Sequence, residues 1–491
     1  MENLQTSIPK VMKHANNKNL KTVAMAVMLL CLGSPQLVEA QSVTVSEAVT
    51  HALNTNPEIK ASFHAFRDVY EEQGVAKGGY LPKVDITAGI GRHWLKSESV
   101  GDKVYWGKGM RLELSQMLFD GFYTANQVCR MKYSGQARYF EFMAAMENIG
   151  LESFRAYVDV LRYREMVNLS RKNYEYHQEI FKQISNRVRA GVAAGVDLEQ
   201  ITARLSLAQS NLVTELSNQH DVSVRYQRYV GELPAENLSP VVLPDKGIPV
   251  NTLETLKEAY LHNYAFLASL SDIKAAQHAV NVQKSKFYPR LDFKAHHDRS
   301  WNLDGVEGRR DESAAELALT YNIINGGEDE AAVHQYREKM YRAVDLKDKA
   351  AIDMRQTIAI AFNEREMIAE QLKYFDRHYK SMEQVRAAYH EQFNVGKRTL
   401  LDLLDTENEY YQARRAFYNG FFDLTIANAR TLAGMGKLLT TMGVVRGEMP
   451  SLKDINVPMP KAMPEDLPPM EEPDRGKLEA KVISLQPLSV R

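Results

Sequence analysis

Two long stretches without proline constrain the fold more than any other feature of this sequence. Residues 83–233 and 290–449 contain none of the 17 prolines of the chain. Proline kinks or ends a helix, so its absence permits very long helices. After an initial segment of different character, each stretch is rich in Ala, Glu, Gln, Arg and Leu, which are good helix formers. The sequence predicts long helices over about 121–189 and 327–395, each roughly 100 Å long.

An apolar stripe runs along the second long helix from Met354 to Phe393. Its 39 residues divide into 11 steps, a mean spacing of about 3.55 residues. This value lies near the 3.5 of a left-handed coiled coil. The helix is therefore expected to pack along its whole length against neighbouring helices, as in a coiled-coil hairpin, and not to cover a compact core.

The two halves of the chain repeat each other. Pro-Lys-Val-Asp at 82–85 is echoed by Pro-Arg-Leu-Asp at 289–292, and Gly191 with Asp197 is echoed by Gly396 with Asp402. A repeat of this length indicates one internal duplication and not an array of short repeats. We expect a first repeat at 41–231, a linker at 232–251 and a second repeat at 252–444. In each repeat a strand pair and a long helix lie between two short helices, expected at 45–78, 197–231, 252–286 and 400–434.

The segment after each of these prolines reads as a pair of strands. Apolar and other side chains alternate over 111–118 and 315–323, the pattern of a half-buried strand. Each strand has about ten residues, the length of a transmembrane β-strand. Polar loops are expected at 96–106 and 302–312, facing the exterior. Aromatic residues at the strand ends resemble the girdles of outer-membrane barrels, namely Trp94, Trp106, Trp301, Tyr80 and Tyr288.

Four strands are too few to close a barrel, which needs about eight. Several copies of the chain would therefore have to share one barrel, and the pattern permits two, three or four. The alternative is a small antiparallel sheet that caps a helical bundle in solution.

The N-terminus predicts export from the cytoplasm. Lysines precede an apolar stretch at 22–33, and Val38-Glu39-Ala40 forms a cleavage site, so residues 1–40 read as a signal peptide. The mature chain would keep only Cys129, which excludes an intrachain disulfide or a zinc site built on cysteines. Nearly equal numbers of basic and acidic residues, 61 and 62, argue against a nucleic-acid partner. Residues 445–491 are proline-rich and acidic, and are expected to be extended or disordered.

The candidate catalytic and metal-binding residues are not spaced as such sites require. His296 and His297 are neighbours on a strand and point to opposite faces, so they cannot share one ion. The glycines near Lys437 lack the preceding strand of a phosphate loop. No nucleophile, base and orienting group form a set. We therefore expect no enzyme, no cofactor and no metal.

Several motifs together resemble one known family. They are Tyr80-Leu81-Pro82, Leu118-Phe119-Asp120-Gly121, Asn325-Gly326-Gly327 and the segment Phe-Asn-Val-Gly-Lys-Arg-Thr-Leu-Leu-Asp-Leu-Leu-Asp at 393–405. In this order they resemble the TolC-like outer-membrane factor family over about residues 41–444. The resemblance implies a homotrimer in the outer membrane of a Gram-negative cell, with a twelve-stranded barrel and a helical tunnel in the periplasm.

The resemblance also implies roles for the turns near Gly191 and Gly396. These turns would be periplasmic tips that contact an adaptor protein through Gly191, Gly195, Gly396, Lys397, Thr399 and Leu400. Asp402, Asp405 and Arg398, with Asp197 in the first tip, would form the gate. Where the family's best-known member has an aromatic hydroxyl, this chain has Phe393. Rings of aspartate would favour cations; the alternative makes Asp402 an N-cap of its helix.

The implied function is a gated, passive exit duct. The resemblance favours a type I protein secretion system, with a periplasmic adaptor and an inner-membrane transporter of the ABC type. The alternative within the same fold is the outer-membrane component of a multidrug or metal efflux pump. A secreted coiled-coil scaffold or adhesin is a further alternative, which would leave the duplicated strand pairs unexplained.

Overall fold

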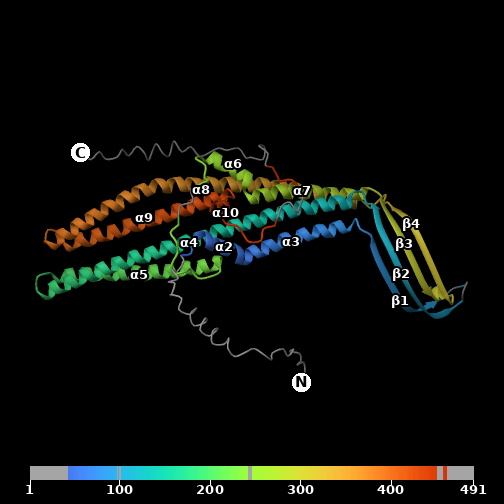
Figure 1. Ribbon diagram of the computed structural model, residues 1–491, viewed down its shortest axis with the longest axis horizontal. Helices are drawn as coiled ribbons and strands as arrows, with labels where there is room; N and C mark the ends of the chain where they lie inside the picture. The colour runs from blue at the N-terminus through green and yellow to red at the C-terminus, as the bar shows by residue number, and fades with distance from the viewer. Residues whose placement is uncertain (1–41, 97, 99–100, 242–245, 451–456, 462–491) are drawn as a thin grey trace, which may run out of the picture.

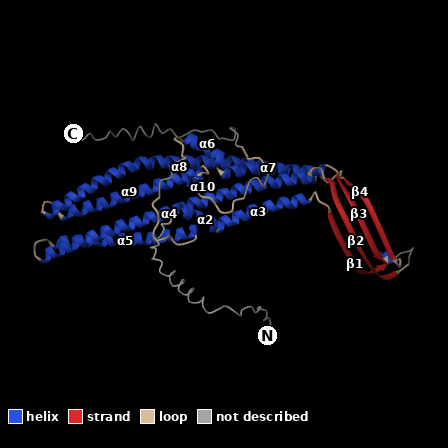
Figure 2. Cartoon of the chain, in the orientation of Figure 1, coloured by secondary structure: helices blue, strands red, loops and turns tan. Residues whose placement is uncertain are grey.

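The computed structural model describes residues 42–96, 98, 101–241, 246–450 and 457–461, so the expected signal peptide lies outside the described residues. The described chain is elongated, with a sheet at one end and two helical hairpins at the other (Figure 1). Helices predominate and strands are confined to one end (Figure 2), which confirms the predicted fold class. Among the described helices, none combines the length and the hydropathy of a membrane span.

Two long helices form the frame of the molecule. α4 (Tyr123–Arg189) and α8 (Glu328–Asn394) have 67 residues each, within two residues of the predicted bounds. Each turns back into a shorter helix, α5 (Gly195–Val230) or α9 (Leu400–Gly434). Every apolar member of the stripe between Met354 and Phe393 is buried or half-buried, because this face of α8 packs against its neighbours.

Two of the predicted short helices are each broken once, so the prediction of continuous helices over 45–78 and 252–286 is wrong. The observed elements are α2 (Val45–Thr55), α3 (Pro57–Gly78), α6 (Thr252–His262) and α7 (Tyr264–Lys284), followed by a short 3-10 turn, η1 (Ser285–Phe287). At both breaks an asparagine, Asn56 or Asn263, has extended backbone, and its side chain accepts a hydrogen bond from an N–H of the next helix. Asparagine is a strong N-cap, and Pro57 favours a new helix start.

The four strands form one antiparallel sheet in the order β1-β2-β3-β4. They are β1 (Lys83–Leu95), β2 (Lys103–Phe119), β3 (Arg290–Trp301) and β4 (Arg309–Thr320). β2 of the first repeat pairs with β3 of the second, so the repeats share the sheet. β1 and β4 are edge strands, and neither has a second partner strand in the described part of the chain.

The predicted loops at 96–106 and 302–312 are too long. β2 begins at Lys103 and β4 at Arg309, so the connections span only 96–102 and 302–308. The polar residues that suggested loops instead continue the strand alternation and pair across the sheet, as Arg299 does with Asp311 at 3.0 Å. At its other end β4 stops at Thr320, before the predicted end at 323.

The sheet has one apolar and one polar face. Strand pairing places Val84, Ile86, Ile90, Met110, Leu112, Phe293, Leu317 and Leu319 on the apolar face, and it places Asp85, Arg111, Glu113, Lys294, Asp298 and Glu316 on the polar face. Ile86 and Leu319 are 69% and 68% exposed. The sheet does not pack its apolar face on its own helices, contrary to the alternative of a cap on a soluble bundle. Alternation of this kind is typical of a membrane barrel.

A buried core lies midway along the helices, where α2, α4, α6, α8, α9 and the short α10 (Leu438–Met442) meet. Glu147 of α4 is buried in this region, at 5% exposure. Burial raises the pKa of Glu147 to about 8, although the backbone N–H groups of Leu439 and Leu438 favour its charged form. One carboxylate oxygen, Oε2, has no hydrogen-bond partner among the described residues.

The raised pKa of Glu147 predicts a pH dependence of stability. Between pH 4.5 and about 8 the folded chain keeps a proton that the unfolded chain releases, so the free energy of unfolding falls as the pH rises. Glu147→Gln should remove this slope and stabilise the protein at pH 8 by about 1–3 kcal/mol. Thermal unfolding at several pH values measures the effect, with Glu72→Gln at an exposed position as control. An unchanged slope in Glu147→Gln would contradict the assignment.

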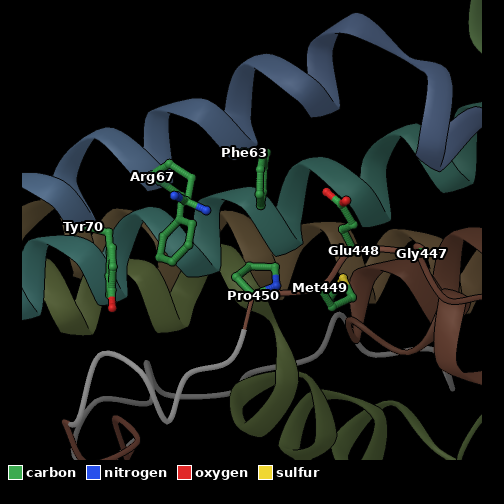
Figure 3. A pocket seen from close by; sticks show the side chains of 8 residues that line it. Phe63, Arg67, Tyr70, Gly447, Glu448, Met449 and Pro450 are labelled. Carbon is green, nitrogen blue, oxygen red and sulfur yellow. The ribbon is translucent and has the colours of Figure 1, made fainter.

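The described pieces of the C-terminal segment lie along the helices. A cavity of about 490 Å³ separates α3 from residues 447–450, with Phe63, Arg67 and Tyr70 on the helix side (Figure 3). Farther along, the side chain of Gln136 donates a hydrogen bond to the carbonyl of Pro458 at 3.0 Å. Residues 447–448 form a bend, and residues 449–450 and 457–461 belong to no helix or strand. Residues 451–456 and 462–491 lie outside the described residues.

Candidate functional site at the hairpin tips

Both hairpins end in the same type of turn. Gly191 and Gly396 have left-handed backbone, with φ of 72° and 77°. In each turn the N–H of the following residue bonds back to a carbonyl five positions earlier, at 2.9 Å in the first tip and 2.8 Å in the second. This Schellman turn favours glycine, because a Cβ atom is strained there. The turns predicted at Gly191 and Gly396 are therefore present in both repeats.

Thr399, and not Asp402, is the N-cap of α9. The Thr399 hydroxyl accepts a hydrogen bond from the N–H of Asp402, and the Asp402 carboxylate accepts one from the N–H of Thr399, both at 3.2 Å. The Thr399 hydroxyl also donates a hydrogen bond to the Asp402 carboxylate at 2.8 Å, and this bond, together with the one from the Thr399 N–H, lowers the pKa of Asp402. The helix begins three residues earlier than an Asp402 cap would require. Asp197 has the same position in α5, but Ala194 offers no side-chain cap there.

Asp405 has a partner that the sequence did not suggest. Its carboxylate pairs with the Arg204 guanidinium of α5 at 2.7 Å. Asp405 keeps 56% of its side chain exposed. Asp402 and Asp405 are three residues apart and so share one face of α9. The tip therefore presents two carboxylates on one face, of which Asp405 is partly neutralised.

Arg398 binds within its own hairpin. Its Nε donates to the Gln392 side chain at 2.9 Å, and its guanidinium lies 4.0 Å from the centre of the Tyr389 ring. Another arginine, Arg187 of α4, contacts the other hairpin at this level and lies 5.3 Å from the ring centre of buried Phe393. At the position where the family's best-known member has an aromatic hydroxyl, this chain therefore has a cation–π contact between Arg187 and Phe393.

Most of the residues expected to contact an adaptor lie on the surface of the tips. Gly191, Gly195, Gly396, Lys397 and Thr399 are exposed. Leu400 is different: it is buried among Ile180, Ile184 and Ile201, so its side chain is not available to a partner. Its apolar side chain holds the two hairpins together at their ends.

The tips also expose apolar residues that the sequence analysis did not select. Val192, Val196 and Val395 are 73%, 71% and 68% exposed. They flank the turn glycines in both repeats. The sequence could have indicated these valines, because an apolar residue beside a polar turn has few side chains of its own hairpin to pack against and so remains exposed.

Farther from the tips, buried ion pairs hold the helices together. Glu407 of α9 is 3% exposed and accepts a hydrogen bond from Arg386 of α8. Glu215 of α5, equally buried, pairs with Arg415 of α9 at 2.5 Å. The second pair joins one hairpin to the other. Loss of one partner from such a pair leaves an uncompensated buried charge.

The aromatic residues predicted to form girdles lie near the two ends of the sheet. Trp94, Trp106 and Trp301 share the apolar face near the turns. Tyr80 and Tyr288 lie at the helical end, at 46% and 53% exposure. Their positions fit two membrane interfaces, and the girdle itself stays a prediction.

His296 and His297 point to opposite faces of β3, as the strand pairing requires. The His297 ring is 2.8 Å from the Ser313 hydroxyl. Within the described residues, no group of three or more His, Cys, Asp or Glu side chains is placed to hold a metal ion.

Comparison with known proteins identifies relatives that are outer membrane efflux and secretion proteins. The sequence profile of the family described as Outer membrane efflux protein matches residues 48–232 and 255–435. The chain is 23% identical to Outer membrane efflux protein BepC of Brucella suis, over 87% of this chain and 92% of BepC. It is also 23% identical to Alkaline protease secretion protein AprF of Pseudomonas aeruginosa, over 82% of this chain and 87% of AprF.

Solved structures share the fold. The Campylobacter jejuni CmeC outer membrane channel superposes with a TM-score of 0.71 at 18% identity, covering 84% of this chain and 89% of CmeC. The profile match covers both repeats and most of the described helices and strands. The chain therefore belongs to the Outer membrane efflux protein family, whose members are channels of the Gram-negative outer membrane and not enzymes.

Proposed function

We propose that the protein is a passive, gated exit duct in which three copies complete one twelve-stranded barrel and one helical tunnel. The open sheet carries this proposal. β1 and β4 both lack a second partner strand in the described chain, and the apolar face is exposed. Edge strands with free backbone groups pair readily with another chain. Pairing β4 of one copy with β1 of the next would remove every edge.

The gate of this duct would lie at the hairpin tips. Three copies of Asp402 and Asp405 would concentrate negative potential on the axis and favour cations. Arg204–Asp405 and Arg187–Phe393 join the two hairpins of one chain. Opening would require the hairpins to separate, and therefore the loss of these two contacts.

The exposed tips would receive the partners. A periplasmic adaptor would contact Gly191, Gly195, Gly396, Lys397 and Thr399, together with exposed Val192, Val196 and Val395. An inner-membrane transporter would supply the energy, since a passive duct performs no chemistry.

For the cargo we propose a secreted protein, exported by a type I system with an ABC transporter. The similarity to an alkaline protease secretion protein supports this choice. The second candidate is efflux of drugs or metals, which the similarity to the outer membrane efflux protein BepC favours. Deletion of the gene separates the two. If a normally secreted protein accumulates inside the cells and is lost from the medium, the first candidate is supported. If the cells only become sensitive to drugs or metals, the second is supported.

Charge removal tests the gate. Asp402→Asn together with Asp405→Asn should lower the cation-to-anion permeability ratio in planar bilayers by about tenfold, because the focused potential disappears. Loss of the exposed Arg204 pair costs under about 1 kcal/mol, so the fold should persist. Glu391→Gln, an exposed change at the end of α8, is the matched control. A parental permeability ratio in the double variant would place these residues away from the pore.

A further inference from the structure

Three neighbouring strands carry the same two-residue pattern on the apolar face. Each has a tryptophan near the turn and a basic residue two positions closer to the helices: Trp94 with Arg92, Trp106 with Lys108, and Trp301 with Arg299. Residues two apart on a strand lie on the same face. We call the first set the tryptophan row and the second set the cation row.

The two rows run diagonally across the sheet. Arg92 is opposite Trp106, and Lys108 is opposite Trp301. Each basic residue is therefore a diagonal neighbour of the next, at a spacing of about 7–8 Å. Strands of a membrane barrel are tilted by about 35–45°, so a diagonal row on the sheet corresponds to a nearly constant height in the membrane.

Below the cation row the apolar face carries no acidic or basic residue apart from His297, as far as β1–β4 are concerned. The row therefore marks the edge of the apolar band. A basic side chain at this depth is unfavourable unless it reaches the interface or has a negative partner.

The described residues offer only one carboxylate to the row. Asp311 pairs with Arg299 at 3.0 Å, and it also binds Arg309. Arg92 and Lys108 form no ion pair with any described carboxylate. They lie beside aromatic rings instead, Arg92 at 5.8 Å from the centre of Trp94 and Lys108 at 4.9 Å from that of Trp301.

The polar face differs at the same end of the sheet. Arg310 pairs with Glu312 at 3.0 Å, and Lys103 donates to the carbonyl of Gly305 at 3.0 Å. Near the turns, Arg310 and Lys103 of the polar face thus have hydrogen-bonding partners within the chain, whereas Arg92 and Lys108 of the apolar face are placed beside aromatic rings only.

We propose that Arg92, Lys108 and Arg299 bind the phosphate groups of a phosphorylated glycolipid in the outer leaflet. Charge complementarity selects this occupant: the row has basic groups in excess, and phosphate accepts charge-assisted hydrogen bonds from both arginine and lysine. The tryptophan row would pack beside the headgroup, as aromatic rings do at membrane interfaces. The inference rests on the proposed barrel, which places this face in the membrane.

The test uses the full-length protein, purified in detergent, with two probes: lipid A bearing both phosphates and the same lipid without phosphates. The wild type should bind the phosphorylated form at least about tenfold more tightly. Arg92→Gln with Lys108→Gln should lose this preference. Arg310→Gln, which removes a basic residue from the polar face, should keep it. Native mass spectrometry counts the bound lipid.

A charge-preserving variant distinguishes the loss of positive charge from misfolding caused by the substitutions. Arg92→Lys with Lys108→Arg should retain the preference, because both positions stay basic. Equal binding of the two lipids by the wild type, or loss of preference in Arg310→Gln, would overturn the proposal. Failure of the barrel itself looks different: the wild type would then neither insert into vesicles nor conduct ions. A protein that inserts and conducts but does not discriminate phosphate contradicts the lipid site alone.

Discussion

Gly121→Ala is expected to prevent normal assembly of the protein. Gly121 lies between β2 and α4, where the sheet meets the helices, and has φ of 65°. A Cβ atom added there would lie 2.5 Å from the carbonyl oxygen of Ser285 and 2.7 Å from the Cβ of Tyr288. Left-handed backbone costs an alanine about 1–2 kcal/mol, and overpacking adds about 1–3 kcal/mol. Folded trimer extracted from outer membranes should fall sharply.

The duplication supplies the matched control for Gly121. Gly326 is its counterpart in the second repeat, with φ of 56° and no atom within 4 Å of an added Cβ. Gly326→Ala should cost only the backbone strain of about 1–2 kcal/mol. The quantities to compare are trimer yield and melting temperature. Equal losses in the two variants would show that the contacts with Ser285 and Tyr288 do not constrain this junction.

Arg386→Leu is expected to destabilise the ends of α8 and α9. Glu407 would remain buried without its partner, and burial already raises the pKa of its carboxyl despite Arg386. Loss of one partner from a buried pair costs about 3–5 kcal/mol. The Arg386 guanidinium also lies 5.0 Å from the ring centre of Tyr176 and 4.8 Å from that of Tyr410, and these contacts would be lost. Hydrogen exchange should become faster in both helices near the tips.

A second substitution identifies the cause. Glu407→Gln combined with Arg386→Leu removes the buried charge and should recover most of the protection from exchange. The exposed pair Lys380–Asp376 is the control, because Lys380→Leu breaks an ion pair worth under about 1 kcal/mol. If the combined variant exchanged as fast as Arg386→Leu alone, packing of Arg386 on the tyrosine rings would be the main contribution.

Local patterns predicted the elements well where the physics is local. Absence of proline, good helix formers and the stripe beginning at Met354 were sufficient for α4 and α8, because helix hydrogen bonds join residues four apart. Period-two alternation located the strands for the same reason. The breaks at Asn56 and Asn263 were also readable, since capping involves only neighbouring residues.

Contacts between distant segments could not be predicted in this way. Nothing near Asp405 in the sequence indicates Arg204, and nothing near Phe393 indicates Arg187. The same holds for the burial of Leu400, which depends on isoleucines of the other hairpin. Strand ends were misjudged because charged residues such as Asp311 pair across the sheet, and cross-strand partners are invisible in a single segment.

The sequence by itself determined the lengths of the two long helices, the duplicated order of elements, the glycine turns at both tips and the alternation of the strands, since each depends on backbone preferences within a few residues. Only the tertiary structure decided which hairpin side chains meet and that the apolar face of the sheet stays uncovered by its own helices. The reason is that burial and ion pairing depend on distances in space, which the packing of two hairpins and four strands sets and no short segment contains.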